Sequence, residues 1–436
     1  GDDGEAGFSG KAAPYARDPD GHFVGWAPGR GPIQSPEGMP WRLPAGTDIV
    51  VGMHMVRPKT ARDVRPSIGV YTTATPPVRV PLAVRIGTRS IEIPPGDAAY
   101  VVTESATLPV AVDLLAVYPH AHYLGREMRL EAARPDGRRL TLLHIPRWDF
   151  HWQQDYRFTA PVALPAGTQL TMRFTYDNSD GNRMNPSHPP VRVVNGPRSV
   201  DEMGEMGLQV LTATSEAAAQ LTREFDDRDT ATTLAAAERW AAREPRSAER
   251  QAFLGAAYLM AGRAQEAIVP LEAALRLDPK SAEAESDLGS AYLRAGRLSD
   301  ALPHLARAVT LSPLNDTMLT NWGNALVDAG RLDQAAAIFA RALATEPDAA
   351  GAVAAHAGWA AALMRQGRTA QAVTHLERAV ALEPGSPANR TDLSSALAAS
   401  GRFADALREA QIALRIDPSY APARVNVQRL NAMGYR

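Results

Sequence analysis

The hydrophobic and polar positions follow different periods in the two parts of the chain. Up to about residue 212, short runs of alternating apolar and polar residues lie between turns rich in Pro, Gly and Thr, and such alternation is typical of half-buried strands. From about residue 216, apolar residues recur every three or four positions in segments rich in Ala, Leu, Arg and Glu. That spacing predicts amphipathic helices.

Five runs in the first part read as strands, and "PDG" at 135–137 reads as the turn of a hairpin. Many short strands without a long helical pattern indicate a β-sandwich or a barrel. The runs are "TDIVVGMHMV", "IGVYTT", "AVDLLAVYPHAHYLG", "MRLEAARPDGRRLTLL" and "TQLTMRFTYDNS".

A repeat of 34 residues runs through the second part. Prolines fall at 245, 279, 313, 347, 384 and 418, so that the spacing is 34 except for one interval of 37. A Gly-Arg pair recurs with the same spacings, starting at 262–263. This part resembles the tetratricopeptide-repeat family. The resemblance implies a curved α-solenoid that binds peptides or protein partners.

Small residues at fixed positions of the repeat predict close helix packing. Gly255, Gly289 and Gly323 would let the first helix of each repeat approach the second, and the glycine of each Gly-Arg pair would turn the chain between them. We expect the three extra residues near "PDAAGAVAAHAGWAA" to lengthen a loop or a helix end. "APARVNVQRLNAMGYR" would cover the last repeat.

Composition narrows the chemistry that the chain can carry. The net charge of −2 gives no general affinity for nucleic acid or anionic lipid. The 436 residues include no cysteine and ten histidines, which excludes disulfides, thiolate metal sites and a cysteine nucleophile. No P-loop, Rossmann glycine run or G-x-S-x-G elbow is present, nor is there a run of apolar residues long enough to span a membrane.

The pair His120-x-His122 is a candidate metal site. On a strand, side chains two apart share one face, and two imidazoles can share copper, zinc or nickel. The motif is weak alone, since two polar residues on an ordinary strand have the same spacing. Met203 could add a thioether that favours Cu(I) or could fill the core; for Met206 we prefer the core. His54, on the polar face of the run 48–56, is a third candidate.

Several motifs up to residue 205 together resemble the copper type II, ascorbate-dependent monooxygenases, the group of peptidylglycine α-hydroxylating and dopamine β-monooxygenases, and above all their bacterial relatives. The motifs occur in family order. They are "GWAPGRGP", "LPAGTDIVVGMHM", "YPHAHYLGREM", "PDG", "LLHIPRWDFHWQQDYRF", "LPAGTQL", "YDNSDGNRMNPSHPP" and "SVDEM".

The resemblance implies two β-sandwich domains with one copper each. His120, His122 and Met203 would hold the copper at which O2 is activated, and His54 would be one of three histidines on an electron-donating copper. Ascorbate or another reductant would supply electrons, and an activated C–H bond would be hydroxylated. The family's adjacent histidine pair is missing, so we expect the chain to begin part-way through the first domain.

We therefore predict three domains: a partial N-terminal β-sandwich over 1–95, a jelly-roll-like copper sandwich over 96–212, and a tetratricopeptide-repeat solenoid with a capping helix over 213–436. The first hypothesis is a copper monooxygenase with a repeat domain for protein interaction, in the bacterial periplasm or secreted. The alternative is a copper-binding or catalytically degenerate β-module in a scaffold protein. The substrate and the partner are not readable from the sequence.

Overall fold

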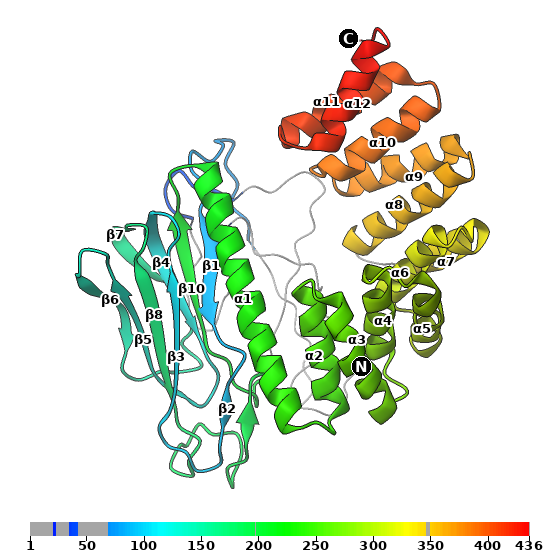
Figure 1. The fold of residues 1–436 in the computed structure, drawn as a ribbon. Helices are drawn as coiled ribbons and strands as arrows, with labels where there is room; N and C mark the ends of the chain where they lie inside the picture. The colour runs from blue at the N-terminus through cyan, green and yellow to red at the C-terminus, as the bar shows by residue number, and fades with distance from the viewer. Residues whose placement is uncertain (1–20, 23–34, 42–68, 197, 346–348, 436) are drawn as a thin grey trace. The chain divides into compact units, whose positions relative to one another are not determined.

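The structure is a computed structural model that describes residues 21–22, 35–41, 69–196, 198–345 and 349–435 (Figure 1). The chain divides into two compact units, Gly1–Ala236 and Ala237–Arg436. The first unit is rich in β-strands and the second consists of α-helices. The part of the sequence with alternating apolar residues therefore forms strands, and the part with apolar residues every three or four positions forms helices.

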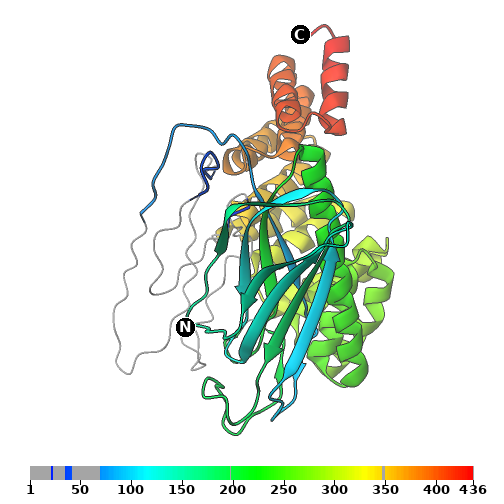
Figure 2. The ribbon, with the colours of Figure 1, turned by 90° about the vertical axis from the view of Figure 1, so that its left-hand side faces the viewer.

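Two four-stranded antiparallel sheets dominate the described residues of the first unit (Figure 2). The first sheet has the order β1 (Leu82–Gly87), β10 (Glu205–Leu211), β4 (Val112–His120), β7 (Tyr156–Leu164). The second has the order β3 (Tyr100–Thr107), β8 (Gln169–Tyr176), β5 (Gly125–Ala133), β6 (Arg139–Ile145). A short ribbon pairs β2 (Glu92–Ile93) with β9 (Val193–Val194).

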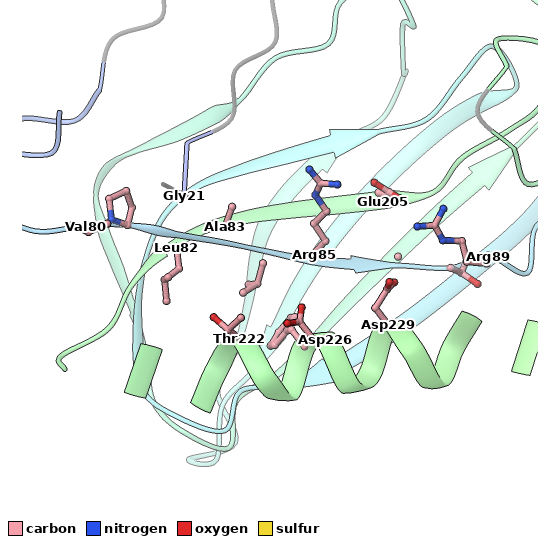
Figure 3. Close-up of a pocket in the computed structure, with 15 residues that line it drawn as sticks. Gly21, Val80, Leu82, Ala83, Arg85, Arg89, Glu205, Thr222, Asp226 and Asp229 are labelled. Carbon is pink, nitrogen blue, oxygen red and sulfur yellow. The ribbon is translucent and has the colours of Figure 1, made fainter. Parts of the chain in front are cut away.

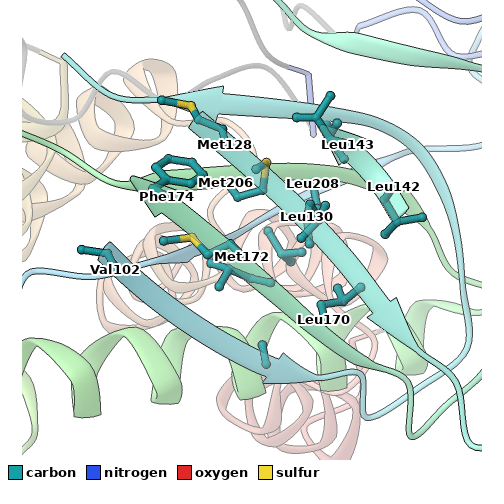
Figure 4. Packing of buried hydrophobic residues seen from close by; sticks show 14 of the residues in the cluster. Val102, Met128, Leu130, Leu142, Leu143, Leu170, Met172, Phe174, Met206 and Leu208 are labelled. Carbon is teal, nitrogen blue, oxygen red and sulfur yellow. The ribbon is translucent and has the colours of Figure 1, made fainter. Parts of the chain in front are cut away.

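One hydrophobic core lies between the two sheets (Figure 4). Met128, Met172 and Phe174 come from the second sheet, Met206 and Leu208 come from the first, and all five are fully buried. Period-two alternation turns these side chains to one face of each strand. The chain thus forms a β-sandwich, and Met206 is a core residue, as expected.

The strands predicted after residue 110 are confirmed, as is the hairpin turn at "PDG", where Gly137 has a φ of 84°. One strand is shorter than predicted, because β4 ends at His120 and leaves His122 beyond it, in the segment that turns toward β5. The strand predicted for "IGVYTT" is wrong. Its described residues 69–73 form no strand and are exposed, because alternation alone supplies no neighbouring strand. The run at 47–56 lies outside the described residues.

The long helix α1 (Ser215–Arg243) begins against the sandwich. Leu221 and Phe225 of α1 are buried in the core of the sandwich, and Arg228 forms an ion pair with Glu104 of β3 at 3.1 Å. The sandwich also includes β1 and β2, which precede residue 96, while most of the predicted first domain lies outside the described residues.

Paired helices form the second unit. The first helix of each pair, called helix A below, is α2 (Ala248–Met260), α4 (Ala282–Arg294), α6 (Asp316–Asp328), α8 (Ala349–Arg365) or α10 (Pro387–Ala399). The second, called helix B, is α3 (Ala264–Leu277), α5 (Leu298–Leu311), α7 (Leu332–Ala344), α9 (Thr369–Leu382) or α11 (Phe403–Ile416). Helix α12 (Ala421–Ala432) follows.

The predicted packing of each pair is confirmed. A Cβ atom on Gly289 would lie 2.6 Å from the Leu305 side chain, so that only glycine allows α4 and α5 to approach this closely. The glycines between helices A and B, from Gly262 to Gly401, all have positive φ. Ser247, Ser281, Asn315 and Ser386 cap the N-termini of helices A with side-chain hydrogen bonds.

The irregular parts of the repeat also follow the prediction. The three extra residues lie in the stretch that gives α8 17 residues, whereas the other helices A have 13 each. Leu430 of α12 is buried on the last repeat, as a capping helix requires. Within the part of the chain that the structure describes, no helix has the length and apolar character that a bilayer crossing requires.

Candidate functional site

His120 and His122 lie where β4 ends, and the structure places their rings together. The ring centroids are 5.2 Å apart and the ring planes meet at 84°. His120 is opposite Glu205 in the register of β4 and β10, so both side chains leave the sheet on the same face. His122 is only 5% exposed. Two imidazoles thus meet at one end of the first sheet.

Each ring is oriented by a hydrogen bond at Nδ1. His122 Nδ1 lies 3.0 Å from the backbone oxygen of Asp201, and His120 Nδ1 lies 2.7 Å from Oε1 of Gln153. Both partners are oxygen acceptors, so Nδ1 is the donor in each ring, and in the neutral form of the ring the lone pair is on Nε2. Metal-binding histidines are commonly oriented in this way, with one nitrogen bonded to an oxygen and the other for the metal.

Glu202 links the histidine segment to Met203. Its carboxylate accepts the backbone N–H of His122, of Leu124 at 2.9 Å and of Met203 at 2.8 Å. The carbonyl oxygen of Met203 accepts the hydroxyl of Tyr176 at 2.8 Å. Residues about eighty positions apart in sequence therefore share one buried carboxyl group, which brings the backbone of Met203 close to that of His122.

The carboxyl group of Glu202 is fully buried. Burial raises its pKa to about 8, and the three backbone N–H groups oppose that rise. Burial, with a smaller contribution from Glu202, also raises the pKa of Tyr176 well above its usual value. Both groups hold the backbone around the histidines, so we assign them a structural role.

The loop after β6 contributes residues for which the sequence predicted no role at the histidine pair. Trp148 donates its indole N–H to the backbone oxygen of His122 at 3.2 Å, and the Phe150 ring lies 5.8 Å from the His122 ring. With Gln153, these residues enclose the histidine pair. The aromatic run "WDFHWQQDY" was the only sequence signal for this wall.

The other candidates lie elsewhere. His144 and His151 are exposed and lie beside Glu127 and Asp149. His54 lies outside the described residues. Among the described residues, no group of three or more His, Cys, Asp or Glu side chains could hold a metal. A metal at His120 and His122 would therefore depend on Met203 or on non-protein ligands.

A separate pocket of about 500 Å³ lies between β1 and α1 (Figure 3). Arg85 and Arg89 come from the strand side, and Asp226 and Asp229 come from the helix side. Its mixed charges suit a polar group. None of the predicted copper ligands lines it.

In the second unit, residues at positions i, i+4, i+7 and i+11 form a stripe along each helix A, on the side away from the most buried residues. We call the stripes of α4, α6, α8 and α10 together the A-helix face. It consists of Glu283, Asp287, Ser290, Arg294; Thr317, Asn321, Asn324, Asp328; Ala354, Gly358, Ala361, Arg365; and Ala388, Asp392, Ser395, Ala399.

The A-helix face has more carboxylates than cations. Arg294 and Arg365 are its two guanidinium groups, and each donates to a backbone oxygen near the end of the preceding helix A, Leu259 and Val327 respectively. The four carboxylates include Asp287, whose pKa burial and the neighbouring Glu283 raise to about 6. This face therefore has a negative character.

Comparison with known proteins identifies the repeats. The tetratricopeptide-repeat family model matches residues 258–309, 292–357 and 363–426. Among solved structures, PilF of Pseudomonas aeruginosa is 20% identical, covering 44% of this chain and 86% of that chain, with a TM-score of 0.39. YrrB, described as a repeat protein with an unusual peptide-binding site, is 17% identical over 44% of this chain and 97% of that chain, with a TM-score of 0.36.

No curated protein matches the chain. The family matches all lie in the second unit, and they show that residues 258–426 carry tetratricopeptide repeats, a fold that mediates protein interactions.

Proposed function

We propose that this protein is a scaffold that binds a cationic segment of a partner protein along the A-helix face and carries copper in its β-sandwich. The observation that carries the first half is the surplus of carboxylates on that face. Stacked helical repeats present an extended surface on which a peptide can lie. Complementary charge selects the partner and speeds its encounter.

The charges on the A-helix face favour lysine and arginine in the partner. Both guanidinium groups of the face are bonded to backbone oxygens, while Asp328 and Asp392 are exposed. Burial and the like charge of the neighbouring Glu283 raise the pKa of Asp287, while Arg294 opposes the rise. A cationic side chain bound there would relieve the repulsion between the two carboxylates.

The test compares two labelled peptides of equal length, one alternating Lys and Ser and the other alternating Glu and Ser. Fluorescence anisotropy should show salt-sensitive binding of the lysine peptide alone. Asp328→Asn and Asp392→Asn should each weaken binding about two- to fivefold. Glu377→Gln on α9, a helix B, makes the same change of charge away from the face and should have no effect. Equal binding of both peptides would contradict the proposal.

The donor set of the β-sandwich suits copper. His120 and His122 can offer Nε2, and the thioether of Met203 favours the cuprous ion. Nδ1 of each histidine is held by an oxygen acceptor, as the support of a metal site requires. We assign copper binding, but no reaction, to His120, His122 and Met203.

A copper monooxygenase is the second candidate, favoured by the two Nδ1 hydrogen bonds and by the family motifs around them. Bound copper would supply oxygen activation. In that case, Gln153 and Asp201 orient the rings, and Trp148 and Phe150 cover the pair. That activity needs a second copper held partly by His54. Two copper ions per chain, one lost in His54→Ala, would favour the monooxygenase, and a single copper that His54→Ala leaves in place favours the scaffold.

A further inference from the structure

Three repeats place a polar pair at the same position between helices A and B. Glu285 with His304, His356 with His375, and Arg390 with Glu409 are each 19 residues apart. The first residue of each pair lies 28 positions before the proline that ends its repeat. These prolines are at positions 313, 384 and 418. The pairs are therefore equivalent, and only their chemistry differs.

The pairs in the second and fifth repeats combine an acidic and a basic group. Glu285 lies 2.6 Å from His304 and 2.8 Å from Arg307, and Arg390 lies 2.7 Å from Glu409. When His304 takes up a proton, it becomes the positive partner of a buried carboxylate. Acid therefore leaves the charge complementarity of both pairs intact.

The fourth repeat instead has two groups that become charged with the same sign. His356 Nδ1 lies 2.9 Å from His375 Nδ1. A hydrogen bond at this distance needs a proton on one Nδ1 and a lone pair on the other. If both rings are protonated, two N–H groups and two positive charges face each other, and the contact is lost.

No described negative charge balances the pair, and the ring of Trp359 offers only a cation–π contact. Trp359 of α8 lies against His375, with ring centroids 4.3 Å apart. The charged group acting on His356 is Arg378 of α9, a cation. Among the described residues of α6, α7, α8, α9 and α10, no carboxylate is paired with either ring. Burial lowers the pKa of both histidines, and Arg378 lowers that of His356 further.

We propose that the His356–His375 contact makes the fourth repeat an acid-sensitive joint, which opens when the pH falls from neutral to about 5 while the second and fifth repeats stay closed. In a stack of repeats, stability depends on each repeat and its neighbours. Opening of α8 and α9 would therefore divide the solenoid. This inference does not depend on the proposed function.

Hydrogen exchange of the full chain tests the joint. Protection factors, which correct for the intrinsic pH dependence of exchange, should fall in α8 and α9 at least about tenfold between neutral pH and pH 5. Those of α4 and α5, with the Glu285–His304 pair, should fall less. The double variant His356→Arg/His375→Glu installs the chemistry of Arg390 and Glu409 and should abolish the difference.

Two further variants keep the test decisive. His375→Gln retains a hydrogen-bonding group that cannot take up a proton, and it should abolish the acid response. It serves as the test if the double variant does not fold. Glu285→His creates the like pair in the second repeat and should make α4 and α5 acid-sensitive. An equal loss of protection in α8 and α9 of the wild type and of His375→Gln would overturn the proposal.

Discussion

The Nδ1 atom of His122 donates to the backbone oxygen of Asp201 at 3.0 Å, across 79 positions of sequence. This bond fixes the proton on one ring nitrogen, so the lone pair lies on the other. The same contact brings the next two residues, Glu202 and Met203, to the end of β4. The two-residue motif thereby lies close to the backbone of Met203, the predicted thioether donor.

Gln153 should support the cluster through His120. Gln153→Leu removes the acceptor for His120 Nδ1, and we expect cuprous affinity to fall about tenfold, as losses of outer partners commonly do. Gln154→Leu changes the neighbouring residue and is the control. Competition with a chromophoric Cu(I) chelator measures both. An unchanged affinity in Gln153→Leu would show that the orientation of His120 does not matter for metal binding.

Glu202 should stabilise the sandwich. Glu202→Leu leaves the N–H groups of His122, Leu124 and Met203 without their buried acceptor, and we expect a loss of about 3 kcal/mol or more in the free energy of unfolding. Glu205→Leu, at a partly buried position on β10, should cost much less. Urea denaturation compares the two, and similar losses would refute the anchoring role of Glu202.

Asp287 should reduce stability at neutral pH. Its folded-state pKa is raised from 3.8 to about 6, so the folded state holds the proton more tightly, and stability is lost as the pH rises through that range. Asp287→Asn should therefore stabilise the protein at pH 7.5 by about 1–2 kcal/mol after allowance for solvent screening. Below about pH 3.8 the two proteins should be alike. Urea titrations at both pH values measure the difference. An Asp287→Asn variant that is less stable than the wild type at pH 7.5 would contradict the prediction.

The close approach of α4 and α5 can be tested at Gly289. A Cβ atom there would meet the Leu305 side chain at 2.6 Å, so Gly289→Ala should destabilise the solenoid by about 1–3 kcal/mol. Gly385→Ala is the matched control, because nothing lies within 4 Å of its Cβ position. The thermal midpoint should fall only in the first variant. Equal midpoints would show that the helices can separate without cost.

Most of the solenoid could be predicted from the sequence, because the same local contacts recur at equivalent positions of each repeat. Gly289 and Leu305 are 16 positions apart, and their spacing recurs in the next repeat as Gly323 and Phe339. The prediction for "IGVYTT" was wrong because a strand also needs a neighbour from elsewhere in the chain. Pattern alone does not provide that neighbour.

The candidate site was predictable only in part, for the same physical reason. His120, His122 and Met203 were identified from their chemistry and from the family motifs. Their supports, Gln153 and Glu202, contact the histidines across 33 and 80 positions of sequence, and no local pattern indicates such partners. The pairs between helices A and B were likewise visible only once the equivalent positions of each repeat could be compared.

Copper content is the measurement that tests the metal-binding claim most directly. After incubation with Cu(I) under reducing conditions and removal of excess metal, elemental analysis should find about one copper per chain in the scaffold account. His120→Ala and His122→Ala should lose it, while His144→Ala, an exposed histidine on β6, should retain it. Absence of copper in the wild type, or its retention in both site variants, would contradict the account.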